Sequence, residues 1–154
     1  MTRVVGVVLA AGALSATALQ RMPPRCQLLT VSEASKLLGM PVVVDPPCSA
    51  GVYHATNFSV EHPNAVEINL KVLPSASAAH AYFPQWLLAA HSTVIPVKNV
   101  GDEAALKHPP PGLDISGINF RTGAVVASIG TVPGVSDSAL ITAARLVVSR
   151  IGKP

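Results

Sequence analysis

The chain has 154 residues, of which 11 are basic, 8 are acidic and 4% are aromatic. Arg3, Arg21 and Arg25 all precede Cys26, so the rest of the chain carries eight basic and eight acidic residues. The chain is long enough for one domain, and the part from Cys26 onward is neutral and poor in aromatic residues. It lacks the basic face and the stacking side chains of a nucleic-acid-binding protein.

The first 18 residues have the organisation of a secretory signal peptide. Arg3 precedes an apolar run over residues 4–14, and residues 15–18 are small, which places cleavage after Ala18. An uncleaved anchor is the alternative, although the run is shorter than the ~20 residues of a spanning helix. We expect a signal peptide over 1–18, a linker over 19–25 and one domain over 26–152. The protein would then be secreted or held in the cell envelope, touching a membrane only through an uncleaved N-terminal segment.

The two cysteines, Cys26 and Cys48, fit an exported protein with one disulfide. Closing that loop would stabilise the fold by about 3 kcal/mol in the chain-entropy model. Two unpaired buried thiols are the alternative. Cys48 has no Cys-x-x-Cys partner and the histidines are scattered singly, so we expect no metal site and no other cofactor.

The first half of the domain predicts one helix and three strands. Thr30 and Glu33 have the spacing of a capping box, which indicates a helix over residues 30–39. Strands are expected over residues 40–44, 51–60 and 65–73. In the last of these, four apolar residues alternate with three polar ones: Val66, Ile68, Leu70 and Val72 against Glu67, Asn69 and Lys71. Such alternation is typical of an antiparallel sheet covered on one face.

A helix over residues 76–90 carries half of the aromatic side chains of the chain. Pro84 lies inside it, which predicts a kink or two short helices. Tyr82, Phe83 and Trp86 would anchor the bend. Aromatic residues at helical spacing mostly pack inward, so these three are expected in the core. The other interpretation, the wall of a pocket, makes them candidate ligand-binding residues.

The second half predicts three strands and a closing helix. A strand is expected over residues 93–97, a turn over 101–104 and an exposed loop over 107–112, with Pro109, Pro110 and Pro111. Residues 113–132 read as a hairpin with a turn at Thr122-Gly123 and Arg121 opposite Ala124. In that register Phe120 faces Val125, Ile118 faces Ala127, and a bulge at Gly117 restores Ile115 opposite Ile129. A final helix over 138–151, capped by Ser136 or Asp137, would bury Leu140, Ala144, Val147 and Ile151.

Together these elements predict an α+β fold in the order α-βββ-α-βββ-α. We expect a mostly antiparallel sheet of about six strands, with the helices packed on one face.

Motifs for catalysis are absent from the sequence. It has no Gly-x-Ser-x-Gly elbow, no Walker loop and no Gly-x-Gly-x-x-Gly. His54 with Glu67, or His80 with His91, could form a proton-transfer or metal pair. Singly placed histidines are more often structural. Asp102-Glu103 is best explained as a turn cap, and Arg121 as a solvated turn residue.

Several short segments resemble one protein group. They are Cys26-Gln27-Leu28-Leu29-Thr30, Glu33-Ala34, Leu38-Gly39, Gly101-Asp102-Glu103-Ala104, Phe120-Arg121-x-Gly123 and the Ala-rich closing helix. The chain is similar in these segments to small exported proteins and lipoproteins of unknown function from actinobacteria, including mycobacteria. The resemblance implies an envelope or secreted location and a disulfide from the first cysteine to one near the second strand. It implies no catalytic residues. Lipid anchoring, common in that group, is not expected, because Arg25 replaces the small residue that lipid modification requires before the cysteine.

We therefore expect a non-enzymatic exported domain that binds an apolar or amphiphilic, lipid-like ligand or an envelope partner protein. The alternative is a domain with no ligand, a purely structural or interaction module that uses the Pro-rich loop. A hydrolase with His54 or His80 and an acid is the third possibility.

Overall fold

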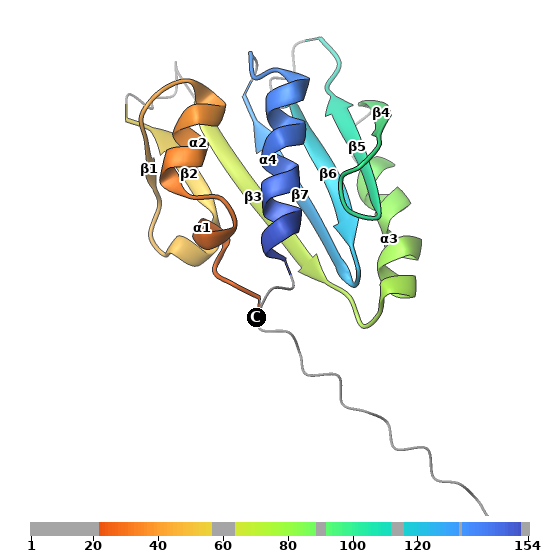
Figure 1. The fold of residues 1–154 in the computed structure, drawn as a ribbon. Helices are drawn as coiled ribbons and strands as arrows, with labels where there is room; N and C mark the ends of the chain where they lie inside the picture. Colours follow the sequence, from red (N-terminus) through yellow and green to blue (C-terminus); the bar gives the residue numbers. More distant parts are fainter. Residues whose placement is uncertain (1–21, 57–63, 89–91, 112–115, 133, 152–154) are drawn as a thin grey trace, which may run out of the picture.

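The computed structural model describes residues 22–56, 64–88, 92–111, 116–132 and 134–151. Within these residues one seven-stranded antiparallel sheet has the strand order β1-β2-β3-β7-β6-β5-β4 (Figure 1). The strands are β1 (Val42–Val44), β2 (Val52–Ala55), β3 (Ala65–Val72), β4 (Thr93–Val97), β5 (Glu103–His108), β6 (Ser116–Thr122) and β7 (Val125–Thr131). The helices are α1 (Arg25–Leu28), α2 (Val31–Leu38), the 3₁₀ turn η1 (Cys48–Ala50), α3 (Ala76–Leu88) and α4 (Asp137–Arg150). The α+β class and the antiparallel sheet are confirmed.

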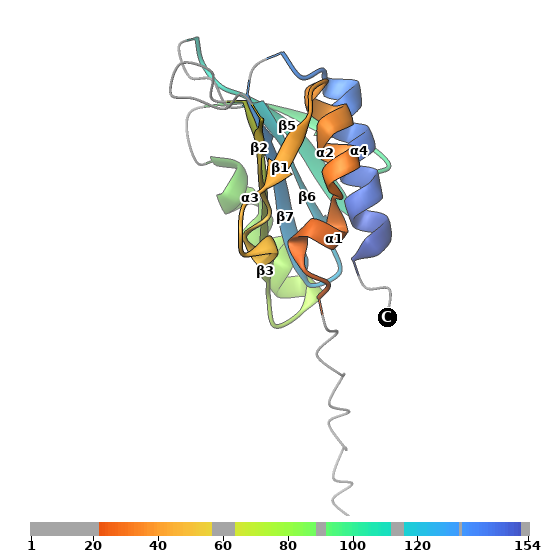
Figure 2. The same ribbon diagram turned by 90° about the vertical axis from the view of Figure 1, so that its left-hand side faces the viewer.

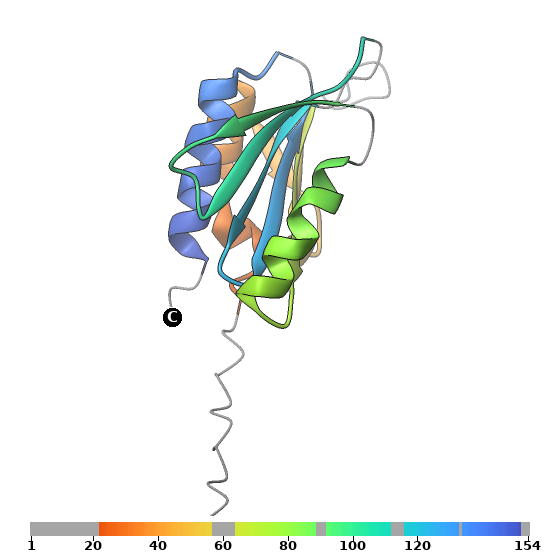
Figure 3. The ribbon, with the colours of Figure 1, turned by 90° about the vertical axis from the view of Figure 1, so that its right-hand side faces the viewer.

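The helices occupy both faces of the sheet, whereas one face was expected. Figure 2 shows α1, α2 and α4 on one side of the sheet and α3 on the other, and Figure 3 shows α3 from the opposite direction. The reason lies in β7, whose neighbouring side chains point to opposite faces. Ala127 joins the core beneath α4, while Val126 packs against Ala79 and Phe83 of α3.

The main core lies between the sheet and the helices α1, α2 and α4. Its fully buried side chains come from α1, from every central strand and from α4: Leu28, Val66, Ile68, Ile118, Phe120, Ile129, Leu140 and Val147. Tyr53 on β2 is also fully buried, and its hydroxyl donates a hydrogen bond to the Leu29 carbonyl. Burial raises the pKa of Tyr53 to about 12. The tyrosine thus ties the segment after α1 to the sheet.

Two short elements at the start of the domain differ from the predicted order. Helix α1 was not expected, and it precedes α2, so two helices rather than one come before β1. A disulfide joins Cys26 on α1 to Cys48 on η1, with the two Cα atoms 5.5 Å apart. The expected pairing is therefore present. It fixes α1 to the loop between β1 and β2.

Helix α2 begins and ends as its sequence predicts. Thr30 is the N-cap, its side chain accepts a hydrogen bond from the Glu33 backbone, and the Glu33 carboxylate accepts one from the Thr30 backbone at 2.9 Å. Gly39 follows in the left-handed conformation. The capping box therefore fixes where α2 starts.

The expected count of about six strands was too low because β5 was predicted as a turn followed by a loop. Its sequence, Glu-Ala-Ala-Leu-Lys-His, contains no β-branched residue and so gives no strand signal. Pairing with β4 on one side and β6 on the other nevertheless holds it in the sheet, with Ala104, Ala105 and Leu106 buried. Tertiary context outweighs local propensity here.

The hairpin of β6 and β7 is present, but its register differs by two residues. Thr122 pairs with Val125, Phe120 with Ala127 and Ile118 with Ile129, so the turn is Gly123-Ala124. Gly123 has a φ of 54°, which suits the first central position of a type II′ turn. A shift of two leaves each side chain on its predicted face. Pairing is continuous from Ser116, and Ile115 of the expected bulge lies outside the described residues.

The remaining predicted elements agree closely with the structure. Helix α3 is one helix that runs through Pro84, not two. Helix α4 begins after Ser136, whose hydroxyl accepts a hydrogen bond from the Ala139 backbone. The expected strand over 51–60 is described only as far as β2, because residues 57–63 lie outside the described part.

Candidate functional site: a groove between α2 and α4

A cavity of about 340 Å³ lies between α2 and α4, on the side of the sheet that carries α1, α2 and α4. Figure 1 shows these two helices side by side. Most of its wall is aliphatic, and the lining residues are Leu29, Glu33, Lys36, Leu37, Ser138, Ala139, Thr142, Ala143 and Leu146. Such a volume is within the range of small-molecule sites.

A second cavity of about 440 Å³ continues from the first toward the start of α4. It is lined by the end of α2 and the approach to α4: Lys36, Leu37, Leu38, Gly39, Met40, Asn64, Val132, Gly134, Val135, Ser136 and Ala139. The two cavities share Lys36, Leu37 and Ala139. We therefore treat them as one feature, the α2/α4 groove.

Small side chains on α4 keep the groove open. Ala139 and Ala143 are four residues apart, so they lie one above the other on the same face of the helix. Leu140, Ala144 and Val147 are buried on the face that contacts the sheet. The alanines leave space next to Leu37 of α2, which larger side chains at these positions would fill.

An ion pair fixes the two walls of the groove. Arg150 at the end of α4 donates hydrogen bonds from Nη2 to Glu33 Oε1 at 2.6 Å and from Nη1 to Glu33 Oε2 at 2.7 Å. These bonds, together with those from Thr30, hold the pKa of Glu33 down at about 2. Burial of the carboxylate opposes this shift without outweighing it. The Glu33 carboxylate is thus charged at neutral pH, and both of its oxygens accept hydrogen bonds.

Among the described residues that line the groove, Lys36 is the charged residue without a bonded partner. Its side chain is exposed and belongs to the wall of both cavities. Among the described residues no hydrogen bond or ion pair engages its ammonium group. The Oδ1 atom of Asp137, at the start of α4, lies 3.3 Å from Nε2 of His108. The groove therefore offers an aliphatic wall and one unneutralised positive charge.

The aromatic residues of α3 lie on the opposite face of the sheet from the groove. Phe83 is buried against Ala79 and Val126, with Tyr82 and Trp86 packed around it. The Tyr82 and Trp86 rings meet edge to face, with centroids 6.1 Å apart. Lys71 Nζ lies 4.0 Å from the centroid of the Tyr82 ring. These contacts attach α3 to the back of the sheet.

A second charged cluster joins β5, β6 and α3. Arg121 is 9% exposed, not the solvated turn residue that was expected. Its Nε donates to Glu103 Oε1 at 2.7 Å and its Nη1 to Asp102 Oδ2 at 3.0 Å. The Asp102-Glu103 pair is thus more than a turn cap, because both carboxylates bind this arginine.

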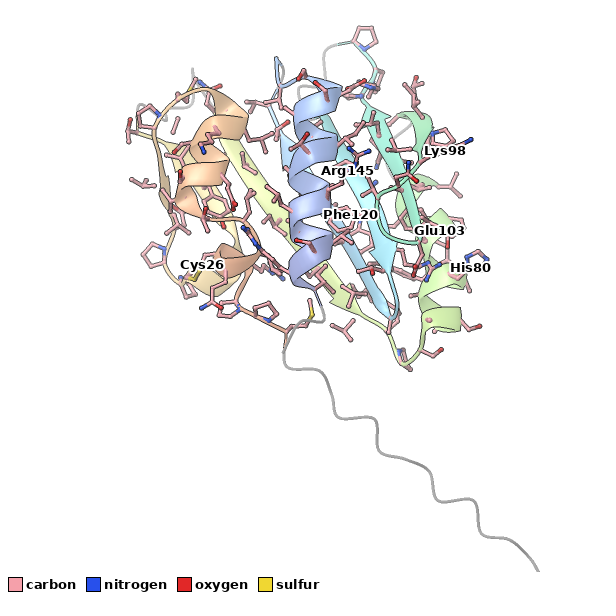
Figure 4. The ribbon with its side chains drawn as sticks, viewed as in Figure 1. Cys26, His80, Lys98, Glu103, Phe120 and Arg145 are labelled. Carbon is pink, nitrogen blue, oxygen red and sulfur yellow. A yellow bond between two sulfur atoms is a disulfide. The ribbon has the colours of Figure 1, made fainter. Side chains whose placement is uncertain are left out.

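His80 completes that cluster at the surface. Its Nδ1 lies 2.5 Å from Glu103 Oε1, while its side chain remains 68% exposed (Figure 4). Burial raises the pKa of Glu103, but the bonds from His80 and Arg121 outweigh this and lower it. His91, the other partner considered for His80, lies outside the described residues. Arg121 Nε also donates to Glu103 Oε1. His80, Glu103 and Arg121 therefore form one network of side-chain contacts.

The other candidate residues are dispersed. His54 Nε2 lies 3.5 Å from Asp45 Oδ2. Pro109 and Pro110 are half-buried, Pro111 is exposed, and residues 112–115 lie outside the described part. Over the described ranges, no group of three or more histidine, cysteine, aspartate and glutamate side chains is placed to hold a metal ion.

The groove residues were missed because the sequence gives only a weak signal for them. Ala139 and Ala143 could have indicated a shallow face on α4, but alanine is also an ordinary helix former. Within the described part of the chain, no helix is sufficiently long and apolar to cross a membrane. A scan against models of known protein families finds no match, and a search of curated proteins finds none either.

Proposed function

We propose that this protein is an exported, non-enzymatic domain that binds an apolar or amphiphilic small molecule in the α2/α4 groove. The observation that carries the proposal is the pair of adjoining cavities, about 340 and 440 Å³, of which the first has a largely aliphatic lining and the second a mixed one. Burying apolar ligand surface there would contribute roughly 25 cal/mol per Å² before the costs of binding.

The disulfide and the signal-like N-terminal sequence support the exported location. The resemblance to actinobacterial envelope proteins agrees with it, and we extend the proposal to membership of that group. The charged clusters support a non-enzymatic role, because Glu33, Glu103 and Arg121 are engaged in bonds that join helices and strands.

The test is binding of N-phenyl-1-naphthylamine, a neutral apolar dye, by the disulfide-bonded protein. Thr142 is exposed and lines the groove, so Thr142→Phe fills the groove with little risk to the fold. Ser149 is exposed on the same helix and outside both cavities, which makes Ser149→Phe the matched control.

We expect the dye to bind the parent protein and Ser149→Phe equally, and to bind Thr142→Phe at least tenfold more weakly. Ala139→Phe, which narrows both cavities, should give the same loss. Dye binding that is equal in all four proteins, or absent from the parent, would refute the groove as the site.

A further inference from the structure

The charged side chains around the α2/α4 groove indicate the charge of the ligand, which the apolar wall of the groove does not. Glu33 is neutralised by Arg150 through two short hydrogen bonds. Asp137 lies beside His108, and Arg145 donates to the Asn99 carbonyl at 3.2 Å. Lys36 alone among the charged residues lining the two cavities is left without a bonded partner in the described part of the chain. The described lining of the groove is therefore complementary to a single negative charge.

The position of Lys36 also indicates where that charge would lie. Lys36 is common to both cavities, at their junction. From there, Leu29, Leu37, Ala143 and Leu146 provide an aliphatic path along the first cavity. A ligand with its charge at Lys36 and an alkyl chain beside these residues would satisfy both features.

The first cavity is small for a lipid with two chains. Its 340 Å³ is near the lower end of the 300–1,000 Å³ that is usual for small-molecule sites. One alkyl chain is the better match. A carboxylate is the simplest anionic group that can pair with a lysine ammonium by a charge-assisted hydrogen bond.

We infer that the α2/α4 groove binds a monomeric long-chain carboxylate, with its alkyl chain between α2 and α4 and its carboxylate at Lys36. This inference rests on the proposed function and adds the chemical class of the ligand. The carboxylate is recognised by charge and the chain by burial, so the two contributions can be measured separately.

The experiment compares three ligands that share a dodecyl chain: dodecanoate, the neutral 1-dodecanoylglycerol and the cationic dodecyltrimethylammonium. Each is titrated calorimetrically below its critical micelle concentration at pH 7.5. The proteins are the parent, Lys36→Gln, Lys36→Arg and Lys98→Gln. Lys98 follows β4, is exposed and does not line the groove, so it serves as the charge-matched control (Figure 4).

We expect the parent to bind dodecanoate roughly fivefold more tightly than it binds the neutral ligand. The difference in affinity between dodecanoate and the cation should be larger. Lys36→Gln should remove this preference, while Lys36→Arg and Lys98→Gln retain it. Raising the salt concentration from 0.05 to 0.5 M should reduce it.

Equal affinity for the three ligands in the parent, or an unchanged preference in Lys36→Gln, would overturn the inference. The proposed function would still stand in that case, provided Thr142→Phe weakens binding of the neutral dye at least tenfold. Binding to phosphatidylglycerol vesicles without binding of monomeric dodecanoate would also overturn it, in favour of a membrane-surface role. Failure of the dye and of all three ligands to bind would refute the proposed function as well.

Discussion

Arg150, in the last turn of α4, donates hydrogen bonds from Nη1 and Nη2 to the Glu33 carboxylate in the first turn of α2. The same arginine donates to the Leu28 carbonyl at 2.8 Å, at the end of α1. This one side chain thus connects α4 to α1 and α2, whose contacting residues lie 117 residues or more before Arg150 in the chain. This connection holds α2 and α4 together at one end of the groove, while the small side chains of Ala139 and Ala143 leave the space between the helices unfilled.

The Glu33–Arg150 pair should make stability depend on pH in the acid range. The pKa of Glu33 is lowered from 4.5 to about 2, so the folded state binds this proton less readily than the unfolded state. The stabilisation is complete above pH 4.5 and is lost as pH falls toward 2. Allowing for solvent screening, we expect Glu33→Gln to lower the free energy of unfolding by about 2 kcal/mol at pH 7.

The measurement is urea denaturation of the parent and Glu33→Gln between pH 7 and pH 2. The difference between the two proteins should shrink steadily below pH 4.5. Glu67 is exposed on the back of the sheet, and Glu67→Gln serves as the control, with little change at either pH. A difference that is constant with pH would contradict the ion-pair explanation.

The buried Arg121 should be a major contributor to stability. Arg121→Gln removes a buried guanidinium and leaves the half-buried carboxylate of Glu103 and the exposed carboxylate of Asp102 without this cation. We expect a loss of about 3 kcal/mol in the free energy of unfolding. His80→Ala removes only an exposed partner of Glu103 and should cost less than about 1 kcal/mol. Chemical denaturation at pH 7 would reveal the contrast, and equal losses would show that Arg121 does not act as the centre of this cluster.

The disulfide should stabilise the start of the domain. Cys26 and Cys48 are 22 residues apart, and the bridge attaches α1 to η1. Replacing both cysteines with alanine should lower the free energy of unfolding by about 3 kcal/mol. Thermal melts of the double variant and of the parent, each with and without reductant, provide the measurement. Reductant should affect only the parent, and a parent insensitive to reductant would argue against this contribution.

Gly101 should tolerate a side chain far less well than Gly39. Both have positive φ, +56° and +71°, but a Cβ at Gly101 would lie 2.3 Å from the Arg121 carbonyl oxygen, whereas nothing lies within 4 Å at Gly39. Gly39→Ala should cost about 1 kcal/mol from backbone strain alone. Gly101→Ala should cost about 3 kcal/mol, because the turn must move away from β6. Equal costs in chemical denaturation would show that the close approach is unimportant.

The sequence predicted elements where the local pattern and the final environment agree. The Thr30–Glu33 capping box fixed the start of α2, and the alternation from Val66 to Val72 predicted β3. The hairpin turn of β6 and β7 was located within one residue, and the disulfide was anticipated from the number of cysteines. Each of these signals acts over a short stretch of chain.

The predictions failed where distant residues decide the outcome. Strand β5 has no local strand signal and exists because β4 and β6 pair with it. The burial of Arg121 depends on Asp102 and Glu103 of a neighbouring strand and its turn. The groove requires α4 to lie beside α2, which neither helix specifies by itself. Its residues could therefore be identified only from the folded chain.

We expect the ligand to bind between α2 and α4 and not at the aromatic residues of α3. The most direct test is a titration with dodecanoate followed by amide correlation spectra of the isotopically labelled, disulfide-bonded protein. We predict shift changes concentrated in Val31–Leu38 and in the first half of Asp137–Arg150, with the α3 signals of Tyr82 and Trp86 unchanged. Changes concentrated in α3 and the adjoining Val126, with α2 and α4 unaffected, would contradict the account and transfer the site to the opposite face of the sheet.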